Sequence, residues 1–419
     1  MSLASENRIE PDPYKVDLTE INMSDSLLYE QGLARRYFQR LRREAPIHFL
    51  ENSPVGPFWS ITKFKDILEI SRNHKDFSAD SSRGGHILGY EDWLSADPEM
   101  PMMIAMDPPR HGIQRSAVSP AMAAPNVRKM EAGIRKNASD ILNSLPEDDI
   151  FDWVEKVSVE LTMRTLAVLF EFPIESIDKL KRWSDLMLAV PGNGVIDSWE
   201  QRKKEILEMA RVFRELRNER KGRTDAFDIV SLIANSLDAD SLTEEEFLGN
   251  IGLLVIAGND TTRNSLTGSV LALNLFPTEE AKLRASPQLI PNFCSEAIRW
   301  QTPVTHMKRN VVRDTKIDGY SLKEGDKVVM WYTSGNNDED VIENGDTLLA
   351  DRPNANNHLS FGFGIHRCVG SRVAELQLRI AWEEMLKRFR SIEVVGSPVR
   401  LRSHVLDGYL ELPVRVKRF

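Results

Sequence analysis

One stretch of roughly 33 residues, 243–275, constrains the fold of this chain more than any other. It opens with Thr243-Glu-Glu-Glu246, a capping box in which a hydroxyl and a carboxylate satisfy free backbone N–H groups at a helix start. Apolar residues then recur at helical spacing up to Leu275, and Pro277 ends the pattern. At about 1.5 Å per residue, such a helix is about 50 Å long. We therefore expect one helix that crosses the whole molecule, with the other elements packed around it.

The rest of the chain is predicted to be mainly helical, with few strands. Helical spacing of apolar residues occurs at 150–172, 198–219, 226–237 and 371–389, and strand patterns occur at 46–50, 57–62, 327–332 and 409–416. The Gly-Tyr pair after Ile317-Asp318 is typical of a hairpin turn. Because strands do not alternate with helices, a doubly wound parallel sheet is excluded. We expect a mainly α fold with small peripheral β-sheets.

Nothing in the sequence marks a boundary between domains. It has no low-complexity linker, no repeat at a fixed period and no long block of one charge. We interpret residues 26–419 as a single domain and residues 1–25 as an N-terminal extension. Three segments interrupt the helical pattern, at 83–109, 191–195 and 337–367. The last is long for a connection inside a compact domain, which favours a functional role.

Charge and apolar patterning exclude several classes of protein. The chain has 54 Lys and Arg against 63 Asp and Glu, a net charge of -9, whereas non-specific binding of nucleic acid needs a basic face. The longest strongly apolar stretch, 251–258, is far shorter than the about 20 residues that span a bilayer. The start of the chain lacks the pattern of a secretory signal, and two cysteines cannot build a disulfide framework. We expect a cytoplasmic protein without a transmembrane anchor.

A glycine-rich loop, His358-Leu-Ser-Phe-Gly-Phe-Gly-Ile-His-Arg-Cys368-Val-Gly370, leads into the helix predicted at 371–389. Cys368 therefore lies just before a helix start, where free N–H groups and the positive end of the helix dipole favour a thiolate. The glycines of the loop let the backbone approach a large, flat group.

Three other interpretations of this loop compete from the residues alone. Cys368 can be an ordinary buried thiol. It can bind zinc with His366, although no second ligand pair completes the site. Gly362-x-Gly364-x-x-Arg367 also comes close to a dinucleotide-binding fingerprint, but its third position is Arg and no strand is predicted before it.

The spacing Phe361-x-x-Gly364-x-His366-x-Cys368-x-Gly370 resembles the haem-thiolate loop of the cytochrome P450 monooxygenases. The resemblance extends from about Leu33 onward and implies the cytochrome P450 fold, with the long helix crossing over the haem. It also implies that Cys368 is the axial ligand of the iron in haem b, with O2 as co-substrate. A thiolate ligand pushes electron density onto the iron and favours cleavage of the O–O bond.

The centre of the long helix reads Ala257-Gly258-Asn259-Asp260-Thr261-Thr262, a run of poor helix formers that suggests a local groove. The alternative is a glycine that lets another helix pack closely, with threonine hydroxyls bonded to preceding carbonyls. The run is similar to the oxygen-activating motif of the family. The resemblance implies that Asp260 and Thr261 are catalytic and organise the delivery of protons that splits dioxygen, while Thr262 is structural.

The resemblance also implies functions for two further groups of charged residues. Glu296 and Arg299 share one helix face and match the structural Glu-x-x-Arg pair of the family, with Arg352 as the candidate third partner. His111 and Arg115 lie at i, i+4 on a helix that Pro108 and Pro109 can start, a spacing that suits a carboxylate. The resemblance implies that this carboxylate is a haem propionate and that Arg309 and His366 bind the propionates too.

Three strings resemble the soluble bacterial branch that hydroxylates medium-chain alkanes and fatty acids at the terminal carbon. They are Met103-Ile-Ala-Met-Asp-Pro-Pro-Arg-His111, Ile298-Arg-Trp-Gln-Thr-Pro-Val-Thr-His306 and Gly258-Asn-Asp-Thr-Thr-Arg-Asn264. The expected pocket is apolar and narrow, because a methyl C–H bond is selected over a weaker methylene C–H bond only by shape. Its candidate residues are Ile87, Leu88, Met103, Leu254, Gly258, Val304, Met307 and Leu406.

No internal flavin or nicotinamide site is visible, so the electrons must come from another protein. The branch implies a ferredoxin and an NAD(P)H-dependent ferredoxin reductase. A basic patch of Arg110, Arg367, Arg372 and Arg379 suits an acidic ferredoxin, although ordinary solvated charges explain these residues equally well.

Three other functions stay open. The substrate can be another small hydrophobe, such as a terpenoid or a steroid. A non-catalytic haem-thiolate sensor or electron carrier also uses a Cys ligand, but Asp260 and Thr261 argue against it because a carrier needs no proton delivery. A dinucleotide-dependent dehydrogenase rests only on the near match of the glycine loop.

Overall fold

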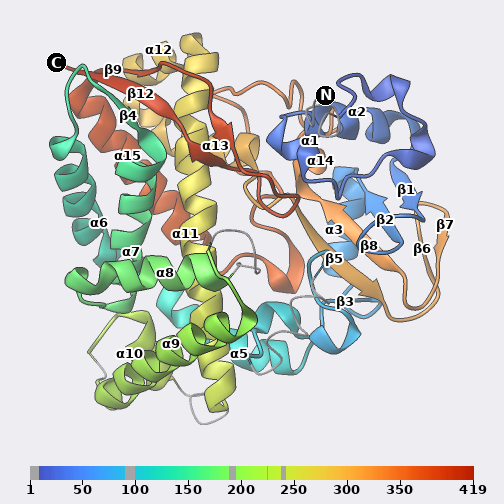
Figure 1. Cartoon of the computed structure of the whole chain (residues 1–419), viewed down its shortest axis with the longest axis horizontal. Coiled ribbons are helices and arrows are strands. Elements are labelled where there is room, and N and C mark those ends of the chain that lie inside the picture. Colours follow the sequence, from blue (N-terminus) through green and yellow to red (C-terminus); the bar gives the residue numbers. More distant parts are fainter. Residues whose placement is uncertain (1–8, 90–99, 188–194, 224, 237–241) are drawn as a thin grey trace.

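The computed structural model describes residues 9–89, 100–187, 195–223, 225–236 and 242–419. Helix α11, Glu244–Leu275, runs through the middle of the molecule (Figure 1). The predicted capping box is present, because the Thr243 hydroxyl accepts from the Glu246 N–H at 3.2 Å and a Glu246 carboxylate oxygen accepts from the Thr243 N–H at 2.9 Å. The turn predicted at 191–195 lies almost wholly outside the described residues.

The other helices pack around α11. They are α1 Leu27–Glu30, α2 Ala34–Glu44, α3 Phe64–Arg72, α5 Arg110–Val118, α6 Ala124–Ser144, α7 Glu160–Phe170, α8 Ile177–Met187, α9 Trp199–Arg220, α10 Ile229–Ala234, α12 Pro277–Ala285, α13 Ile290–Gln301, α14 Tyr332–Gly335 and α15 Ser371–Arg388. Trp153, Trp183 and Phe213 are fully buried in the large apolar core of this helical part. Burial of such side chains is the dominant favourable contribution to folding.

The strands form small sheets at the periphery. Their bounds are β1 Ile47–Leu50, β2 Phe58–Ile61, β3 Phe77–Ser78, β4 Ile150–Asp152, β5 His306–Val311, β6 Thr315–Ile317, β7 Tyr320–Leu322, β8 Lys327–Trp331, β9 Phe389–Val394, β10 Val399–Arg400, β11 Tyr409–Glu411 and β12 Pro413–Arg418. The largest sheet has the order β1-β2-β8-β5-β3, in which only β2 and β8 run parallel. A second sheet has the order β4-β12-β9, and β6–β7 and β10–β11 form two-stranded pairs.

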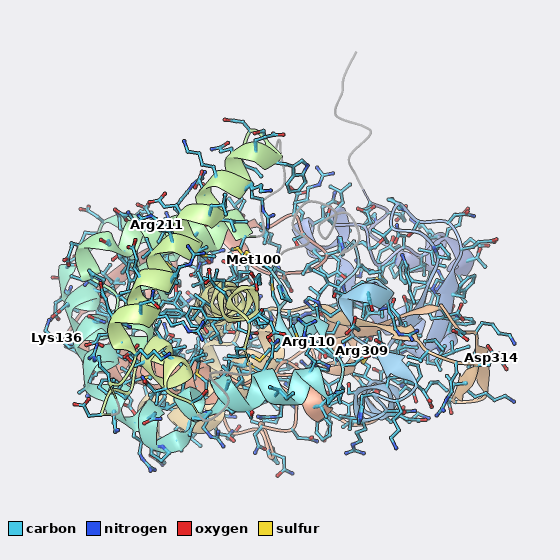
Figure 2. All side chains as sticks on the ribbon, turned by 90° about the horizontal axis from the view of Figure 1, so that it is seen from below. Met100, Arg110, Lys136, Arg211, Arg309 and Asp314 are labelled. Carbon is cyan, nitrogen blue, oxygen red and sulfur yellow. The ribbon has the colours of Figure 1, made fainter. Side chains whose placement is uncertain are left out.

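The five-stranded sheet lies on one side of α11 and most helices lie on the other (Figure 1). From below, Lys136 of α6 and Asp314, which lies between β5 and β6, mark the two ends of the long axis (Figure 2). Residues before α1 contribute to the sheet side, where Ile21 and Met23 are buried in a cluster with Phe38 and Trp331. The mainly helical architecture with peripheral sheets confirms the fold predicted from the sequence.

Two local predictions were wrong. Residues 150–172 do not form one helix, because Ile150–Asp152 is a strand that pairs with Pro413–Arg415 in β12, and a turn of π-helix precedes α7. The strand predicted at 409–416 is divided between two sheets, since β11 pairs with β10 while β12 lies between β4 and β9. In both cases pairing with distant strands decides the structure, and local periodicity does not report such pairing.

Candidate active site

An apolar cavity lies between α11 and the glycine-rich loop that precedes α15. Its lining includes Ala257, Gly258 and Thr261 of α11, and Phe361, Cys368 and Val369 of the loop. Met103, Leu254, Val304 and Met307 also line it, so most of the pocket residues expected from the sequence meet at one place.

The loop around Cys368 owes its shape to two glycines in the left-handed region. Gly362 has φ +64° and Gly364 has φ +70°, conformations that favour glycine. Gly364 also lies against the end of α3, where an added methyl group would overlap the carbonyl oxygen of Ser71. The Cys368 N–H donates to the Phe361 carbonyl oxygen at 2.8 Å, which closes the loop and directs the sulfur toward the cavity.

The environment of the Cys368 thiol acts on its pKa in two directions. Burial raises the pKa, and it outweighs the N–H of Gly370 and the positive charges of Arg367 and Arg115, which favour the thiolate. The helix start and the two arginines therefore favour the thiolate, as the sequence predicts, while burial opposes it.

Two cationic side chains and two histidines gather at one end of the cavity. His111 and Arg115 come from α5, Arg309 from β5 and His366 from the loop. The His111 and His366 rings have their centroids 4.3 Å apart. Burial lowers the pKa of His111 to about 4, with the charge of Arg115 adding to the effect, and burial also lowers the pKa of His366.

These groups lack an anionic partner among the described residues. Arg309 is 5% exposed and donates to the Lys308 carbonyl oxygen at 2.7 Å, but no carboxylate lies within ion-pair distance of it. Arg115 donates to the Arg367 carbonyl oxygen at 2.6 Å, and the buried Nε2 of His366 has no hydrogen-bond partner. A buried cation without a close ion pair is costly, and Arg309 is such a cation, although the charge of nearby Asp107 partly compensates it. The cavity therefore fits a flat group with carboxylates at one edge, as the two propionates of haem are.

Asp260 and Thr261 point to different sides of α11. The Thr261 side chain lines the cavity, and its hydroxyl donates to the Ala257 carbonyl oxygen at 2.7 Å. Asp260 is 5% exposed, is not part of the cavity wall and forms an ion pair with Arg263 at 2.7 Å. Burial raises the pKa of Asp260, while Arg263 opposes this rise and the charge of Asp185 adds to it.

The run of poor helix formers does not interrupt α11, which continues through residues 257–262 without a break. Ala257, Gly258 and Thr261 line the cavity, and close packing of another helix against Gly258, the alternative interpretation, is present as well. An added methyl group on Gly258 would lie 2.7 Å from Cδ2 of Leu166, so this glycine allows α7 to pack closely. The next residue, Asn259, forms hydrogen bonds with α7 and α8. It accepts from the Thr162 hydroxyl at 2.9 Å and donates to the Ser184 hydroxyl at 3.0 Å.

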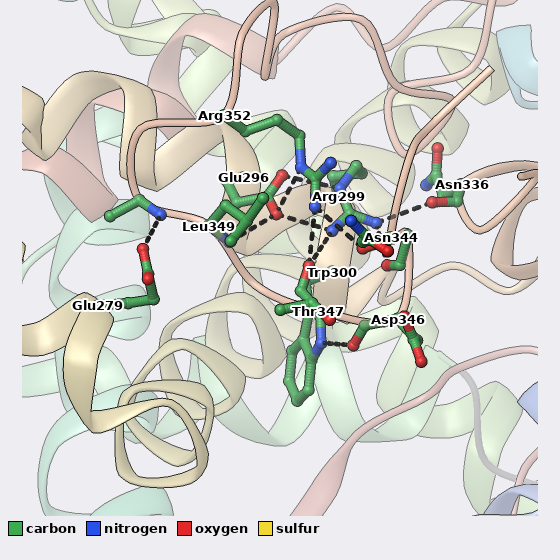
Figure 3. A network of polar contacts seen from close by, with 12 residues as sticks. Glu279, Glu296, Arg299, Trp300, Asn336, Asn344, Asp346, Thr347, Leu349 and Arg352 are labelled. Carbon is green, nitrogen blue, oxygen red and sulfur yellow. Dashed lines mark hydrogen bonds and ion pairs between the residues drawn. The ribbon is translucent and has the colours of Figure 1, made fainter.

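Behind the loop, Glu296 joins Arg299 and Arg352 in a buried network (Figure 3). Arg299 binds both carboxylate oxygens of Glu296 at 2.7 Å, and Arg352 Nε binds one of them at 2.8 Å. Arg299 also donates to the carbonyl oxygens of Asn336 and Gly345, and Arg352 donates to that of Thr347. The network therefore ties α13 to the irregular segment 336–352 that leads toward the cysteine loop.

Several residues expected at the site lie elsewhere. Leu88 is buried in the cluster that contains Phe38 and Trp331, and its N–H contacts His306 Nε2 at 3.3 Å. Ile87 and Leu406 are not among the residues that line the cavity, although Leu406 forms a β-bridge with Val304. Other residues line the cavity besides the eight candidates, notably Ile104 and Tyr332. Ile104 follows Met103 in a string quoted above for the substrate branch, whereas Tyr332 lies at the end of a predicted strand, where no sequence signal pointed to the site.

The predicted basic patch is smaller in the structure. Arg110 pairs with Glu246 at 2.7 Å, and Arg379 pairs with Glu131 at 3.1 Å and Glu383 at 2.9 Å. Arg367 and Arg372 are exposed on the side of the cysteine loop.

Two further findings apply to the described part of the chain. It contains no cluster of three His, Cys, Asp or Glu side chains that could bind a metal ion, so the zinc interpretation is not supported. It also contains no helix that is both long enough and apolar enough to cross a membrane. The glycine loop follows irregular backbone, not a strand, which removes the context that a dinucleotide site needs.

Comparison with known proteins agrees with this geometry. The family model described as Cytochrome P450 matches residues 90–405. Linalool 8-monooxygenase of Pseudomonas putida is 33% identical over 394 residues, which cover 92% of this chain and 96% of the relative. The solved structure of CYP153D17 from Sphingomonas sp. PAMC 26605 is 41% identical with a TM-score of 0.86, covering 95% of this chain and 99% of its own. Cytochrome P450-153 from Novosphingobium aromaticivorans is 39% identical with a TM-score of 0.85, covering 94% and 99%.

The family model spans most of the sequence, and these relatives align along nearly all of it. The cavity wall that contains Cys368 and the buried cations around it fit the haem-thiolate iron that this family uses with O2. The chain therefore belongs to the cytochrome P450 family and is a haem-dependent monooxygenase.

Proposed function

We propose that this monooxygenase hydroxylates the terminal carbon of medium-chain n-alkanes or fatty acids, with electrons from a ferredoxin and its NAD(P)H-dependent reductase. The observation that carries the proposal is the composition of the cavity wall. Around Ala257 it consists of Met103, Ile104, Leu253, Leu254, Val304 and Met307. Flexible and branched apolar side chains suit a slender hydrocarbon, and they offer no partner to a charged group at the reacting end.

The residues at the edge and floor of the cavity would hold the haem. We assign Cys368 as the thiolate that would bind the iron, and His111, Arg115, Arg309 and His366 as the partners of the propionates. The haem iron would supply the activation of O2. These side chains would hold the haem in the cavity beside its apolar lining.

Thr261, which lines the cavity, and Asp260, which is buried away from it on α11, would move protons. The Thr261 hydroxyl is placed to hold a proton donor at the cavity wall. Asp260 is buried beside Arg263 and hydrogen-bonded through Asn259 to Ser184, so it can exchange protons with a polar network behind the helix. A proton relay at this position is not needed by an electron carrier or a haem sensor.

Oxidation of a terpenoid is the second candidate. It is favoured by the 33% identity to linalool 8-monooxygenase, whose coverage of both chains exceeds nine-tenths. The same apolar lining suits the branched hydrocarbon skeleton of a terpenoid, so the two candidates differ mainly in the shape of the carbon skeleton beside the reacting centre.

The experiment is product analysis with dodecane, dodecanoic acid and linalool, using haem-loaded protein, a ferredoxin and its reductase. We expect the terminal alcohol to be the main product from the linear substrates. Mainly subterminal alcohols would refute terminal hydroxylation, and turnover of linalool alone would favour the second candidate.

The haem assignment has its own control. Reduced protein treated with carbon monoxide is expected to show the red-shifted Soret band of a thiolate ligand, and Cys368→Ala is expected to abolish it. Cys294→Ala is the matched variant, because Cys294 is the other thiol and is fully buried in the helical core. A band that survives Cys368→Ala would remove the basis of the proposed chemistry.

A further inference from the structure

Two glycines near the start of α11 lie against residues 100–104, called here the covering segment: Gly249 meets its backbone, and Gly252 meets the Met100 side chain. Gly249 and Gly252 are buried and lie one turn apart. A methyl group added to Gly249 would overlap the carbonyl oxygen of Pro101. One added to Gly252 would lie 3.3 Å from Cε of Met100 and 3.0 Å from Cε of Met187. Figure 2 shows Met100 beside α11, which is seen nearly end-on. The segment therefore approaches the helix as closely as its backbone allows.

A buried side chain fixes the same segment by hydrogen bonds. Asn250, which is 1% exposed, accepts from the Met103 N–H at 3.0 Å and donates to the Gln114 side-chain oxygen at 2.6 Å. One residue of α11 thus holds both the covering segment and helix α5. Arg110, at the start of α5, pairs with Glu246 one turn earlier on α11. Breaking such a buried hydrogen bond would leave polar groups unpaired and would cost free energy. This cost favours the one arrangement in which the bonds are made.

The anchored segment forms part of the cavity wall. Met103 and Ile104 lie in a short 3-10 turn and line the cavity, as do Leu253 and Leu254, one turn after Asn250 on α11. The two facing parts of the wall are therefore attached to the same stretch of helix. Because the contacts at Gly249 and Asn250 involve backbone atoms of the covering segment, a change there moves Met103 and Ile104 together.

We propose that Gly249 and Asn250 are positioning residues that set the width of the cavity and thereby the carbon that is oxidised. This inference rests on the proposed function, since it concerns the choice between terminal and subterminal carbons. Met103 and Leu254 both line the cavity, and their separation would decide whether a linear chain stays extended with its end at the reacting centre. Displacement of Met103 would widen the cavity here, so that the chain can fold and present a methylene group.

The first test measures the anchor itself in the haem-loaded protein, without turnover. Hydrogen exchange of the Met103 amide is compared between the wild-type protein and Asn250→Ala. We expect exchange of this amide to be about fivefold to tenfold faster in the variant, as the loss of one hydrogen bond predicts. Equal exchange would show that Asn250 does not hold the segment and would overturn the inference.

The second test measures the distribution of products from dodecanoic acid. In Asn250→Ala and Gly249→Ala we expect the ratio of subterminal to terminal alcohol to rise about threefold or more, because small displacements at a site change reactivity strongly. A distribution equal to that of the wild-type protein in both variants would overturn the proposal.

Matched variants separate positioning from general damage to α11. Asn274 is on the same helix and makes an equivalent contact far from the cavity wall, accepting from the Val394 N–H at 2.9 Å and donating to the Ile392 carbonyl oxygen at 3.0 Å. Gly268 is also on α11, and an added methyl group there would overlap the side chain of Gln301. Asn274→Ala and Gly268→Ala are expected to lower the melting temperature but to leave the product distribution unchanged. A shift in these controls as large as in the test variants would overturn the proposal.

The products of the wild-type protein test the proposed function separately from the positioning role. If the wild-type protein oxidised dodecanoic acid mainly at subterminal carbons, terminal hydroxylation would be refuted. The positioning role would still be judged from the exchange of the Met103 amide and from the change of each variant relative to the wild-type distribution.

Discussion

At the scale of single residues, the most informative feature is a buried cation that makes no close ion pair, although the charge of Asp107 acts on it. Arg309 has no described carboxylate within ion-pair distance, and the nearby Asp107 already accepts from Ser78 and from the Ala79 N–H. A charge left in this position destabilises the protein until an anion arrives. The residue therefore serves the bound state at the expense of the free one.

We predict opposite effects of Arg309→Met on the haem-free and haem-loaded proteins. The haem-free variant should be as stable as the wild-type protein or more stable, because a buried charge is removed. Haem should dissociate from the variant roughly tenfold to a hundredfold faster, as the loss of a charge-assisted hydrogen bond implies. Denaturant titration of the haem-free proteins and transfer of haem to an acceptor protein measure the two effects.

Arg313→Met is the control for that prediction, because Arg313 is exposed and pairs with Asp76. This variant should leave the rate of haem dissociation unchanged. It should change the stability of the haem-free protein only by the small contribution of a surface ion pair. A haem-free Arg309→Met protein that is strongly destabilised would show that Arg309 has a structural partner we have not identified.

The sequence largely predicted which residues lie at the site, but it did not predict which way their side chains point. The spacing around Cys368 located one wall of the cavity, since the loop must turn at Gly362 and Gly364 to reach it. The side of α11 on which Asp260 lies depends on Arg263, three residues later on the same face. That spacing was present in the sequence and could have indicated that the carboxylate is held away from the cavity.

At the scale of elements, the network around Glu296 determines how α13 meets the segment before the cysteine loop. Glu296 is fully buried and neutralises two arginines that also donate to backbone carbonyl groups of the segment. We predict that Glu296→Gln lowers the free energy of unfolding by about 3 to 5 kcal/mol, because it leaves buried guanidinium groups without their carboxylate. Equilibrium unfolding by denaturant measures this loss.

Glu280→Gln provides the comparison, because Glu280 pairs with Arg284 at i, i+4 on a partly exposed helix surface. This variant should lower the free energy of unfolding by less than about 1 kcal/mol. If both variants lost the same free energy of unfolding, burial of the Glu296 network would not be the reason for its effect on stability.

Strands were harder to predict than helices because their partners are distant. β5 was not predicted at all, since Lys308, Arg309 and Asn310 are consecutive buried polar residues and hide any alternation. The bounds of α11 agree with the predicted stretch 243–275, because its capping box and terminal Pro277 are local signals. Local signals therefore located α9, α10, α11 and α15, whereas α6 was not predicted, and pairing between remote segments decided β4, β5 and β12.

At the scale of the whole molecule, acid should weaken the contact between α6 and α15. Burial alone would raise the pKa of Glu384, but hydrogen bonds from Lys387, Arg135 and Arg388 outweigh it and hold the pKa at about 2. A carboxyl whose pKa is depressed on folding stabilises the protein above its ordinary pKa and loses this contribution as the pH falls toward the folded value. The ordinary value for Glu is 4.5.

We predict that the difference in melting temperature between the wild-type protein and Glu384→Gln is largest near about pH 7 and shrinks steadily from about pH 5 to about pH 3. Glu155→Gln, which alters an exposed ion pair with Lys156, should show no such dependence. A difference that grew on acidification would contradict the sign of the pKa shift.

The parallel pairing of β2 with β8 has a consequence for synthesis. Trp59 pairs with Val328, so the hairpin of β1 and β2 is translated about 270 residues before the strand that completes its sheet. At ordinary elongation rates, its open edge waits about 15 to 50 seconds on the ribosome. An unpaired edge is a template for aggregation, so yield during expression should depend on chaperones that shield the nascent hairpin.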